Sequence, residues 1–249
     1  MKIFTRVLLL TCVSFVAVDG RTQVAAPATD TATPKQIATM RAKLADWPQL
    51  GYYREANAAL RPVAVGEDRV VFYGASVAEY WGKRGSTFFP GKPYINRGIG
   101  GQTSAQMLVR FRQDVIDLHP AAVVILEGTN DIAGDTMPPQ MSENNWRSMA
   151  ELAKANGIRV IFTSITPSSD FPWHRGLHPA GKIQALNTWL KEYCARHSLI
   201  YVDFYPSLVN AEGGMKEDLT VDGVHATPKG YTVMAPFVQA GIDQALRGK

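Results

Sequence analysis

The chain has 249 residues, of which 46% are hydrophobic and 19% charged, and its formal net charge is +4. This length suffices for one good-sized α/β domain, and the composition is that of a globular protein. The weak charge argues against nucleic acid or an anionic membrane surface as a partner.

Residues 1–26 are predicted to be a secretory signal peptide. Lys2 and Arg6 give it a positive start, Val7 to Val18 form an apolar run, and small residues follow. The run is about a dozen residues long, which is too short to span a bilayer comfortably; a retained hydrophobic anchor is the alternative. We therefore expect a secreted or periplasmic protein with no stable membrane insertion after cleavage.

Residues 27–33 are predicted to be a flexible lead-in, after which residues 34–249 form a single domain. The pair Thr33-Pro34 favours a helix start, and a second short helix is expected over Tyr52 to Leu60. Together these helices form an N-terminal extension that ends near residue 62. Only Cys194 remains after cleavage, so no internal disulfide is expected.

Beyond Pro62, short apolar runs alternate with helical segments. The runs are continuous, as in strands buried on both faces of a parallel sheet. The predicted strands are Arg69–Tyr73, Tyr94–Arg97, Ala122–Leu126, Arg159–Thr163 and Ile200–Asp203. The predicted helices are Ser104–Leu118, Ser142–Asn156, Pro179–His197 and Pro228–Leu246. This alternation predicts a three-layer α/β/α domain whose ligands bind at the carboxyl ends of the strands.

Three motifs follow predicted strands directly, at the edge where a ligand is expected. The first is Gly74-Ala75-Ser76, in which Ser76 is either a nucleophile or a helix cap. The second, residues 98–101, reads Gly-Ile-Gly-Gly and lacks the lysine of a phosphate loop, so it is a close backbone approach or a plain strand-to-helix turn. The third is Gly128-Thr129-Asn130-Asp131, where Asn130 either donates its amide to an oxyanion or closes an Asx turn.

The fourth motif, Asp222-Gly223-Val224-His225, precedes the last helix. Its three-residue separation lets the carboxylate reach Nδ1 of the imidazole and leaves Nε2 free for a serine hydroxyl. Taken alone, it could be an Asp-Gly turn ahead of a helix. The four motifs in this order, beside one sheet edge, predict a serine esterase.

With these motifs the chain resembles the SGNH hydrolases, the GDSL esterase/lipase superfamily, from about Asp46 to the C-terminus. The segment around Gly98–Arg112 is similar to secreted bacterial members. The resemblance implies a flavodoxin-like fold with a parallel five-stranded sheet. It also implies that Ser76, His225 and Asp222 are the catalytic triad, and that the oxyanion hole consists of Ser76, Gly101 and Asn130.

Two positions depart from the family pattern. The first motif usually reads Gly-Asp-Ser, and here Ala75 replaces the aspartate, which supports the nucleophile loop without belonging to the triad. Glu127 stands before Gly128, where small or apolar residues are common. We interpret Glu127 either as a plain strand terminus or as a partner of Arg97 near the pocket rim.

The loop after the fourth strand lies on the predicted active edge, where it is either a substrate-contacting rim loop or an inert solvated loop. Trp173, His174 and Arg175 are candidate substrate-binding residues there, and Trp81 is expected near the same rim. His174 and His178 lie four residues apart but have no acidic residue spaced with them, so no metal site is expected.

The expected reaction is hydrolysis of a carboxylic ester through an acyl-enzyme, without a cofactor. The substrate is expected to be a small-molecule or carbohydrate ester, with an acetyl group on a sugar favoured over a lysophospholipid, a thioester or other short-chain esters. A catalytically weak carbohydrate-binding protein on the same fold is the rival hypothesis, motivated by Ala75. Flavin binding on such a sheet is a third hypothesis, which the serine and the Asp-x-x-His loop make unnecessary.

Overall fold

A computed structural model describes residues 32–135 and 137–247. The predicted signal peptide, residues 1–26, and all but the last two residues of the lead-in lie outside this range. The chain divides into two compact units, residues 1–41 and 42–249. In the first, helix α1 (Pro34–Ala45) begins after Thr33, whose hydroxyl accepts a hydrogen bond from the Gln36 N–H at 3.3 Å.

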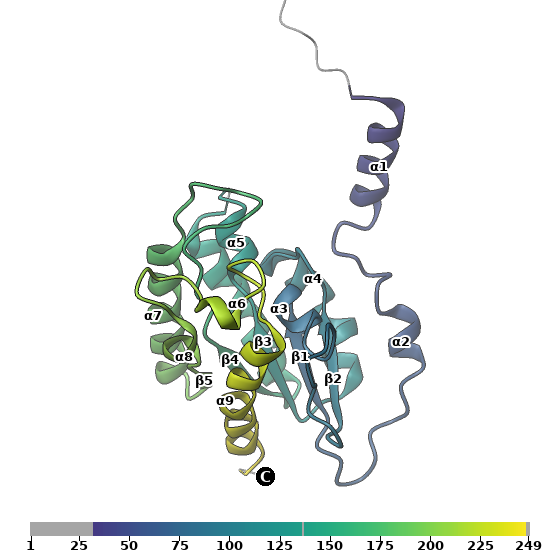
Figure 1. The fold of residues 1–249 in the computed structure, drawn as a ribbon. Coiled ribbons are helices and arrows are strands. Elements are labelled where there is room, and N and C mark those ends of the chain that lie inside the picture. Colours follow the sequence, from purple (N-terminus) through teal and green to yellow (C-terminus); the bar gives the residue numbers. More distant parts are fainter. Residues whose placement is uncertain (1–31, 136, 248–249) are drawn as a thin grey trace, which may run out of the picture. The chain divides into compact units, whose positions relative to one another are not determined.

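The second unit is built on one sheet of five parallel strands, as predicted. The strands are β1 (Val70–Gly74), β2 (Tyr94–Gly98), β3 (Ala122–Leu126), β4 (Arg159–Thr163) and β5 (Ile200–Val202). Their order in the sheet is β2-β1-β3-β4-β5, and every neighbouring pair is parallel (Figure 1). All five carboxyl ends therefore lie at one edge.

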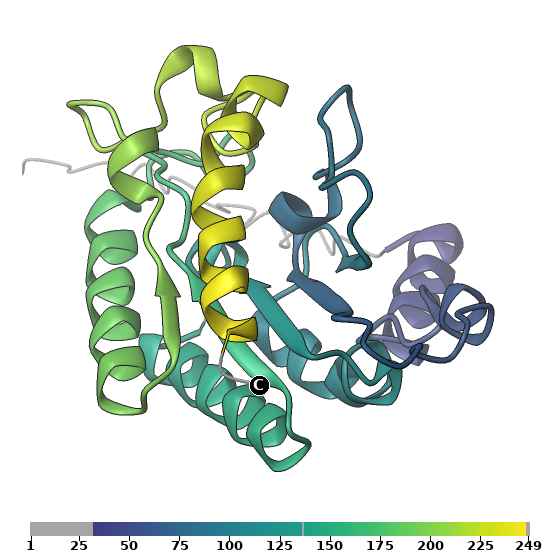
Figure 2. The ribbon, with the colours of Figure 1, turned by 90° about the horizontal axis from the view of Figure 1, so that it is seen from below.

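Helices cover both faces of this sheet, which confirms the three-layer architecture. Figure 2 shows the C-terminal helix α9 (Pro228–Leu246) running across one face. The other face is covered by α4 (Ser104–Asp114), α6 (Pro139–Ala155) and α7 (Ala180–Arg196). The shorter helices are α2 (Arg54–Ala58), α3 (Ser76–Glu79), α5 (Thr129–Ala133) and α8 (Tyr205–Leu208), with 3₁₀ turns at Ile116–Leu118 and Glu217–Leu219.

The core explains why the strand sequences are continuously apolar. In β1, Val71 and Tyr73 pack with the layer that contains α4, α6 and α7, while Val70 and Phe72 pack with the layer that contains α3 and α9. All four side chains are fully buried. Successive residues of a strand point to opposite faces, so a strand between two helical layers needs apolar residues at every position.

Helix ends differ from the predicted bounds where local chemistry intervenes. The helix expected over Ser104–Leu118 stops at Asp114 because Val115 leaves the helical region, with φ −131° and ψ −64°. The helix expected from Ser142 begins earlier, with Pro139 as its first residue, a position that tolerates the missing N–H of proline.

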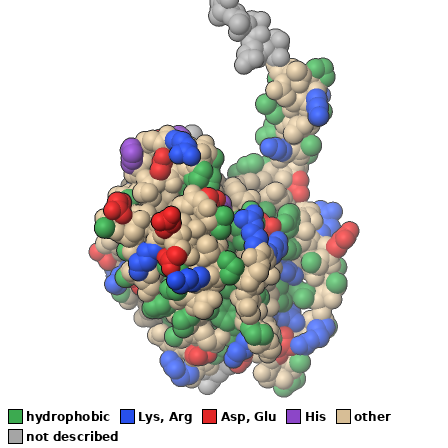
Figure 3. All heavy atoms as spheres, viewed as in Figure 1, with side chains coloured by type: hydrophobic (Ala, Val, Ile, Leu, Met, Phe, Trp, Pro, Cys, Tyr) green, Lys and Arg blue, Asp and Glu red, His purple; other side chains and the backbone are tan. Residues whose placement is uncertain are grey.

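The described part of the chain has no membrane-spanning helix, and the face drawn in Figure 3 has no large patch of charge of one sign. Within the described part, no helix combines the length and the apolar character needed to cross a membrane. On the face drawn in Figure 3, acidic and basic side chains are interspersed rather than gathered by sign.

Candidate active site

Ser76, His225 and Asp222 meet at the carboxyl edge of the sheet. Nε2 of His225 lies 3.0 Å from Oγ of Ser76, and Nδ1 lies 2.7 Å from Oδ2 of Asp222. An ionised carboxylate can only accept, so this second contact places the ring hydrogen on Nδ1. Nε2 is then free to accept the hydrogen of the serine hydroxyl.

The end of strand β1 presents Ser76 to this site. Gly74 is its last residue, and a Cβ there would lie 2.3 Å from the carbonyl oxygen of Leu126, so only glycine fits between the strands. Ser76 then begins α3, where its N–H precedes the first intrahelical hydrogen bond. This N–H has no hydrogen-bond partner in the described part of the chain.

The loop before α9 is shaped so that Asp222 and His225 face each other. Oδ1 of Asp222 accepts the backbone N–H groups of Val224 at 3.1 Å and His225 at 2.8 Å. Gly223 adopts φ +87°, a left-handed conformation that favours glycine. Burial raises the pKa of Asp222, but the hydrogen bonds from the His225 N–H and imidazole outweigh it and hold the pKa below its usual range.

Two further groups face the same cleft and can donate to an oxyanion. Gly101 has φ +78°, and its N–H has no hydrogen-bond partner among the described residues. Asn130, in α5, donates one Nδ2 hydrogen to the carbonyl of Gln102 at 2.8 Å, which fixes the amide and leaves its second hydrogen unused. The structure thus brings Ser76, Gly101 and Asn130 to the lining of one cleft.

This cleft has a volume of about 690 Å³, and two aromatic side chains lie close to the histidine in its lining. The ring centroid of Tyr80 lies 5.3 Å from that of His225, and that of Trp173 lies 5.9 Å away. Trp173 is 51% exposed and stacks on Phe171. Flat apolar surfaces therefore border the polar reacting groups.

The predicted rim residues occupy different places. Trp173 lines the cleft, whereas Nδ1 of His174 lies 2.7 Å from the carbonyl oxygen of Ala133 and ties the loop to α5. Arg175 is exposed and is not among the residues that line the cleft. Trp81 is 2% exposed and packs against Phe72, so its expected place at the rim was wrong. It lies in the turn after α3, where its N–H donates to the carbonyl of Ala78 at 3.1 Å, and its side chain belongs to the core.

Glu79 and Tyr80 line the cleft and were not singled out from the sequence. They follow Ser76 by three and four residues, and this spacing places side chains on one face of a helix. This spacing from Ser76 is the sequence signal that could have identified Glu79 and Tyr80 as residues of the cleft. Glu79 accepts the Gly100 N–H at 2.6 Å and the Tyr52 hydroxyl at 2.8 Å, so it also anchors the loop that carries Gly101.

Residues 46–58, which we call the strap, hold this loop from outside. The hydroxyl of Tyr53 donates to the carbonyl of Gly98. The side chain of Gln102 donates to the carbonyl of Pro48 at 2.9 Å, and that of Gln113 to the carbonyl of Leu50 at 2.8 Å. The strap therefore fixes both the oxyanion loop and helix α4.

A buried arginine connects the nucleophile strand to the same loop. Arg110 has no exposed surface, and it donates to the carbonyls of Gly74 at 3.1 Å and Arg97 at 2.9 Å. It also donates to the side chain of Gln102 and pairs with Asp114 at 3.0 Å. One guanidinium thereby ties together the ends of β1 and β2.

Arg97 does not pair with Glu127, in contrast to one of the two interpretations from sequence. Its guanidinium donates to Asn57 Oδ1 at 2.7 Å and to the carbonyl of Asn96. Glu127 is 8% exposed, and neither carboxylate oxygen has a hydrogen-bond partner. The described residues contain no cluster of three or more His, Cys, Asp or Glu side chains suited to a metal ion.

The α/β/α fold and the hydrogen-bonded arrangement of Ser76, His225 and Asp222 are together those of an ester hydrolase. The sequence model of the GDSL-like Lipase/Acylhydrolase family matches residues 63–233. The chain belongs to this family and is a carboxylic ester hydrolase.

Similar proteins agree with this assignment. Esterase TesA from Pseudomonas aeruginosa is 30% identical over 132 residues, which are 53% of this chain and 60% of TesA. A GDSL-like lipase from Bacteroides thetaiotaomicron is 42% identical, with a TM-score of 0.77 over 80% of this chain and 100% of the lipase. A solved protein from Bacteroides fragilis, 44% identical, also has a TM-score of 0.77, over 80% of this chain and 98% of its own.

Proposed function

We propose that the protein is a serine esterase that works through an acyl-enzyme and removes short acyl groups, above all acetyl, from a carbohydrate. The observation that carries the mechanism is the hydrogen-bonded chain from Ser76 through His225 to Asp222. Ser76 and His225 line a cleft that is also lined by Gly101 and Asn130.

In the first half of the reaction, Ser76 Oγ attacks the ester carbonyl carbon while its proton passes to Nε2 of His225. Asp222 orients the ring and stabilises the imidazolium. The carbonyl oxygen becomes an oxyanion, which accepts hydrogen bonds from the N–H groups of Ser76 and Gly101 and from the second Nδ2 hydrogen of Asn130. The imidazolium then donates its proton to the leaving alcohol oxygen as the ester C–O bond breaks.

In the second half, a water molecule takes the place of the departed alcohol. His225 accepts one of its protons while the oxygen attacks the acyl carbon, and the same donors stabilise the second oxyanion. The bond from the acyl carbon to Ser76 breaks, and the imidazolium returns the proton to Oγ. The carboxylic acid leaves and the enzyme is regenerated without any cofactor.

The walls of the cleft support a sugar as the alcohol part of the ester. The leaving oxygen must lie against Nε2 of His225 to receive its proton, so the alcohol lies near Tyr80 and Trp173, whose ring centroids are 5.3 and 5.9 Å from that of the histidine. Aromatic faces suit the apolar faces of a sugar ring, and the polar lining suits its hydroxyls. A lysophospholipid or a thioester is the alternative substrate.

Hydrolysis of acetylated xylo-oligosaccharides, methyl acetate and a lysophospholipid by the same preparation tests the proposal. We expect Ser76-dependent release of acetate, fastest from the sugar ester. Trp173→Ala should lower kcat/KM for the sugar ester by at least about tenfold, the cost of roughly 1.4 kcal/mol of transition-state binding, and should lower it less for methyl acetate. Phe237→Ala, which removes an exposed aromatic side chain from α9, is the matched control.

The same panel separates the alternatives. Preference for the lysophospholipid would replace the sugar as substrate, and tight sugar binding without acetate release would favour the carbohydrate-binding protein. Secretion or periplasmic location is proposed from the sequence of residues 1–26 alone; export and cleavage of a tagged full-length chain test it.

A further inference from the structure

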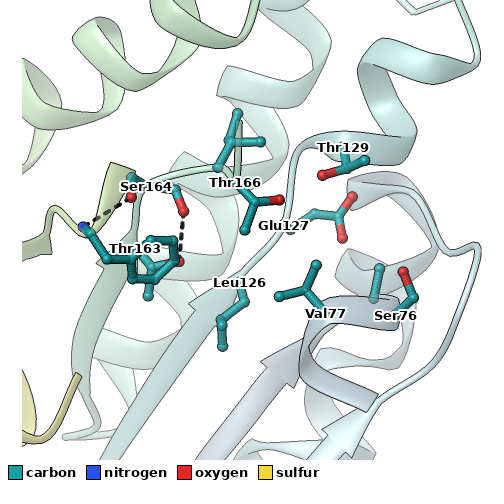
Figure 4. Close-up of a pocket in the computed structure, with 11 residues that line it drawn as sticks. Ser76, Val77, Leu126, Glu127, Thr129, Thr163, Ser164 and Thr166 are labelled. Carbon is teal, nitrogen blue, oxygen red and sulfur yellow. Dashed lines mark hydrogen bonds between the residues drawn. The ribbon is translucent and has the colours of Figure 1, made fainter. Parts of the chain in front are cut away.

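Ser76 lines a second hollow besides the substrate cleft. It is a cavity of about 20 Å³, formed where β1, β3 and β4 end. This is room for a single water molecule. Figure 4 shows the carboxyl group of Glu127 in this cavity, pointing between Ser76 and Thr129. Thr163, Ser164 and Thr166 also line it, beside the apolar side chains of Val77, Leu126 and Ile165.

Glu127 is the unusual member of this lining. Its side chain is more than nine-tenths buried, yet both carboxyl oxygens are without a hydrogen-bond partner. A buried, unpaired negative charge is costly. Burial, and then the nearby charge of Asp131, raise the pKa of Glu127 well above its usual value, while the nearby backbone N–H of Gly128 and, more weakly, Arg110 oppose the shift. A neutral carboxyl group can donate as well as accept, and it does not repel an oxyanion.

The register of the sheet places Glu127 beside Ala75. The last pair between β1 and β3 is Gly74 with Leu126, so the next residues of the two strands are neighbours. Both line the same cavity. These are the two positions that depart from the family pattern, with a carboxyl group missing at 75 and an additional one at 127. Both departures therefore fall on one site.

We propose that Glu127, directly after β3, supplies the carboxyl group that Ala75, directly after β1, lacks, and that it acts as a positioning residue for Ser76. The cavity has space for a water molecule but not for a second carboxyl side chain. The small residue at 75 and the large one at 127 are thus a matched pair. The predicted effects on kcat rest on the proposed esterase function. The pairing of positions 75 and 127 and its predicted effect on stability do not.

A double-mutant cycle on the full chain tests the pairing. Wild type, Glu127→Ala, Ala75→Asp and the double variant are compared in kcat and KM on p-nitrophenyl acetate and in urea-induced unfolding. Glu127→Ala should lower kcat by on the order of 10²-fold with little change in KM, because a displaced nucleophile loses rate rather than ground-state binding. Ala75→Asp alone should also lose activity and stability, since it forces a second carboxyl group into the cavity.

The double variant decides the question. It should regain at least about tenfold in kcat over Glu127→Ala and unfold at higher urea than either single variant, a non-additivity expected of residues that share a cavity. If Glu127→Ala does not fold, recovery of a folded protein in the double variant supports the pairing in the same way. Glu127→Gln, which keeps the shape and a hydrogen-bond donor, should lose less than about threefold.

Additive effects in both kcat and stability would overturn the pairing, as would equal losses in Glu127→Gln and Glu127→Ala. The stability half of the cycle needs no turnover. If the wild type hydrolyses none of the esters, the proposed function fails, while non-additive stabilities would still support the pairing of positions 75 and 127.

Discussion

Nε2 of His225 lies 3.0 Å from Oγ of Ser76, although the two residues are 149 positions apart in the chain. The serine is fixed by the end of β1, and the histidine by the loop before α9. The contact therefore exists only when the sheet and its C-terminal helix are assembled.

Ser76→Ala should remove nearly all ester hydrolysis while the protein stays folded. Loss of a triad nucleophile costs on the order of a millionfold in kcat. The side chain is small, and alanine creates no large cavity. Initial rates on p-nitrophenyl acetate and thermal unfolding of both proteins provide the check. A variant that kept more than about a tenth of the wild-type rate would exclude Ser76 as the nucleophile.

Asp222→Asn should lower kcat by on the order of 10⁴-fold, because an amide favours the wrong tautomer of the imidazole. The same change should leave the backbone loop largely intact, since the amide oxygen can still accept the N–H groups of Val224 and His225. The measurement is kcat on a soluble acetyl ester. Asp218→Asn, an exposed aspartate paired with Lys229, is the control. A loss below about fivefold in Asp222→Asn would remove the carboxylate from the mechanism.

Asn130→Ala should lower kcat by roughly 10²–10³-fold with a small effect on KM, the value of one oxyanion donor. Because the amide also donates to the carbonyl of Gln102, Asn130→Asp is a useful companion: it keeps the size but has no N–H to offer. Both variants should lose kcat. A pure rise in KM in both would identify Asn130 as a ground-state binding group instead.

Glu127→Gln should change how stability depends on pH. The pKa of Glu127 is raised in the folded state, so its stabilising effect is present below its ordinary value of about 4.5 and is lost as pH rises toward the folded pKa. Glutamine stays neutral throughout. The wild type should therefore lose stability relative to the variant above about pH 4.5, by at most about 1.4 kcal/mol per pH unit.

Urea unfolding of wild type and Glu127→Gln between about pH 4 and 9 measures this difference. The charged groups that act on Glu127, namely Asp131 from α5 and Arg110 from α4, are common to both proteins. A stability difference that does not vary with pH would show that Glu127 titrates normally.

Sequence patterns predict the sheet well because burial on both faces leaves a strong signal. The predicted Ala122–Leu126 strand coincides with β3, and all four motifs lie beside the same edge. Side-chain direction is harder to predict. Trp81 and Tyr80 are neighbours in sequence, yet one is in the core and the other borders the cleft, because successive side chains of the turn after α3 point in different directions.

Partners that depend on distant segments were also missed. Arg97 could be matched with Glu127 by charge, but the structure pairs it with Asn57 of the strap, an amide with no sequence signal for that role. The register of β1 against β3, which makes Ala75 and Glu127 neighbours, follows from the assembled sheet. Neither local composition nor periodicity contains that information.

The strap has a practical consequence for anyone who trims this protein. The family match begins at residue 63, after the last residue of the strap. A truncation at that boundary would delete Tyr53, which holds the carbonyl of Gly98, and the backbone carbonyls that accept from Gln102 and Gln113. The shortened chain would retain every reacting group but lose the outer support of the loop that carries Gly101. Domain limits drawn from shared sequence thus exclude a segment on which the active-site geometry depends.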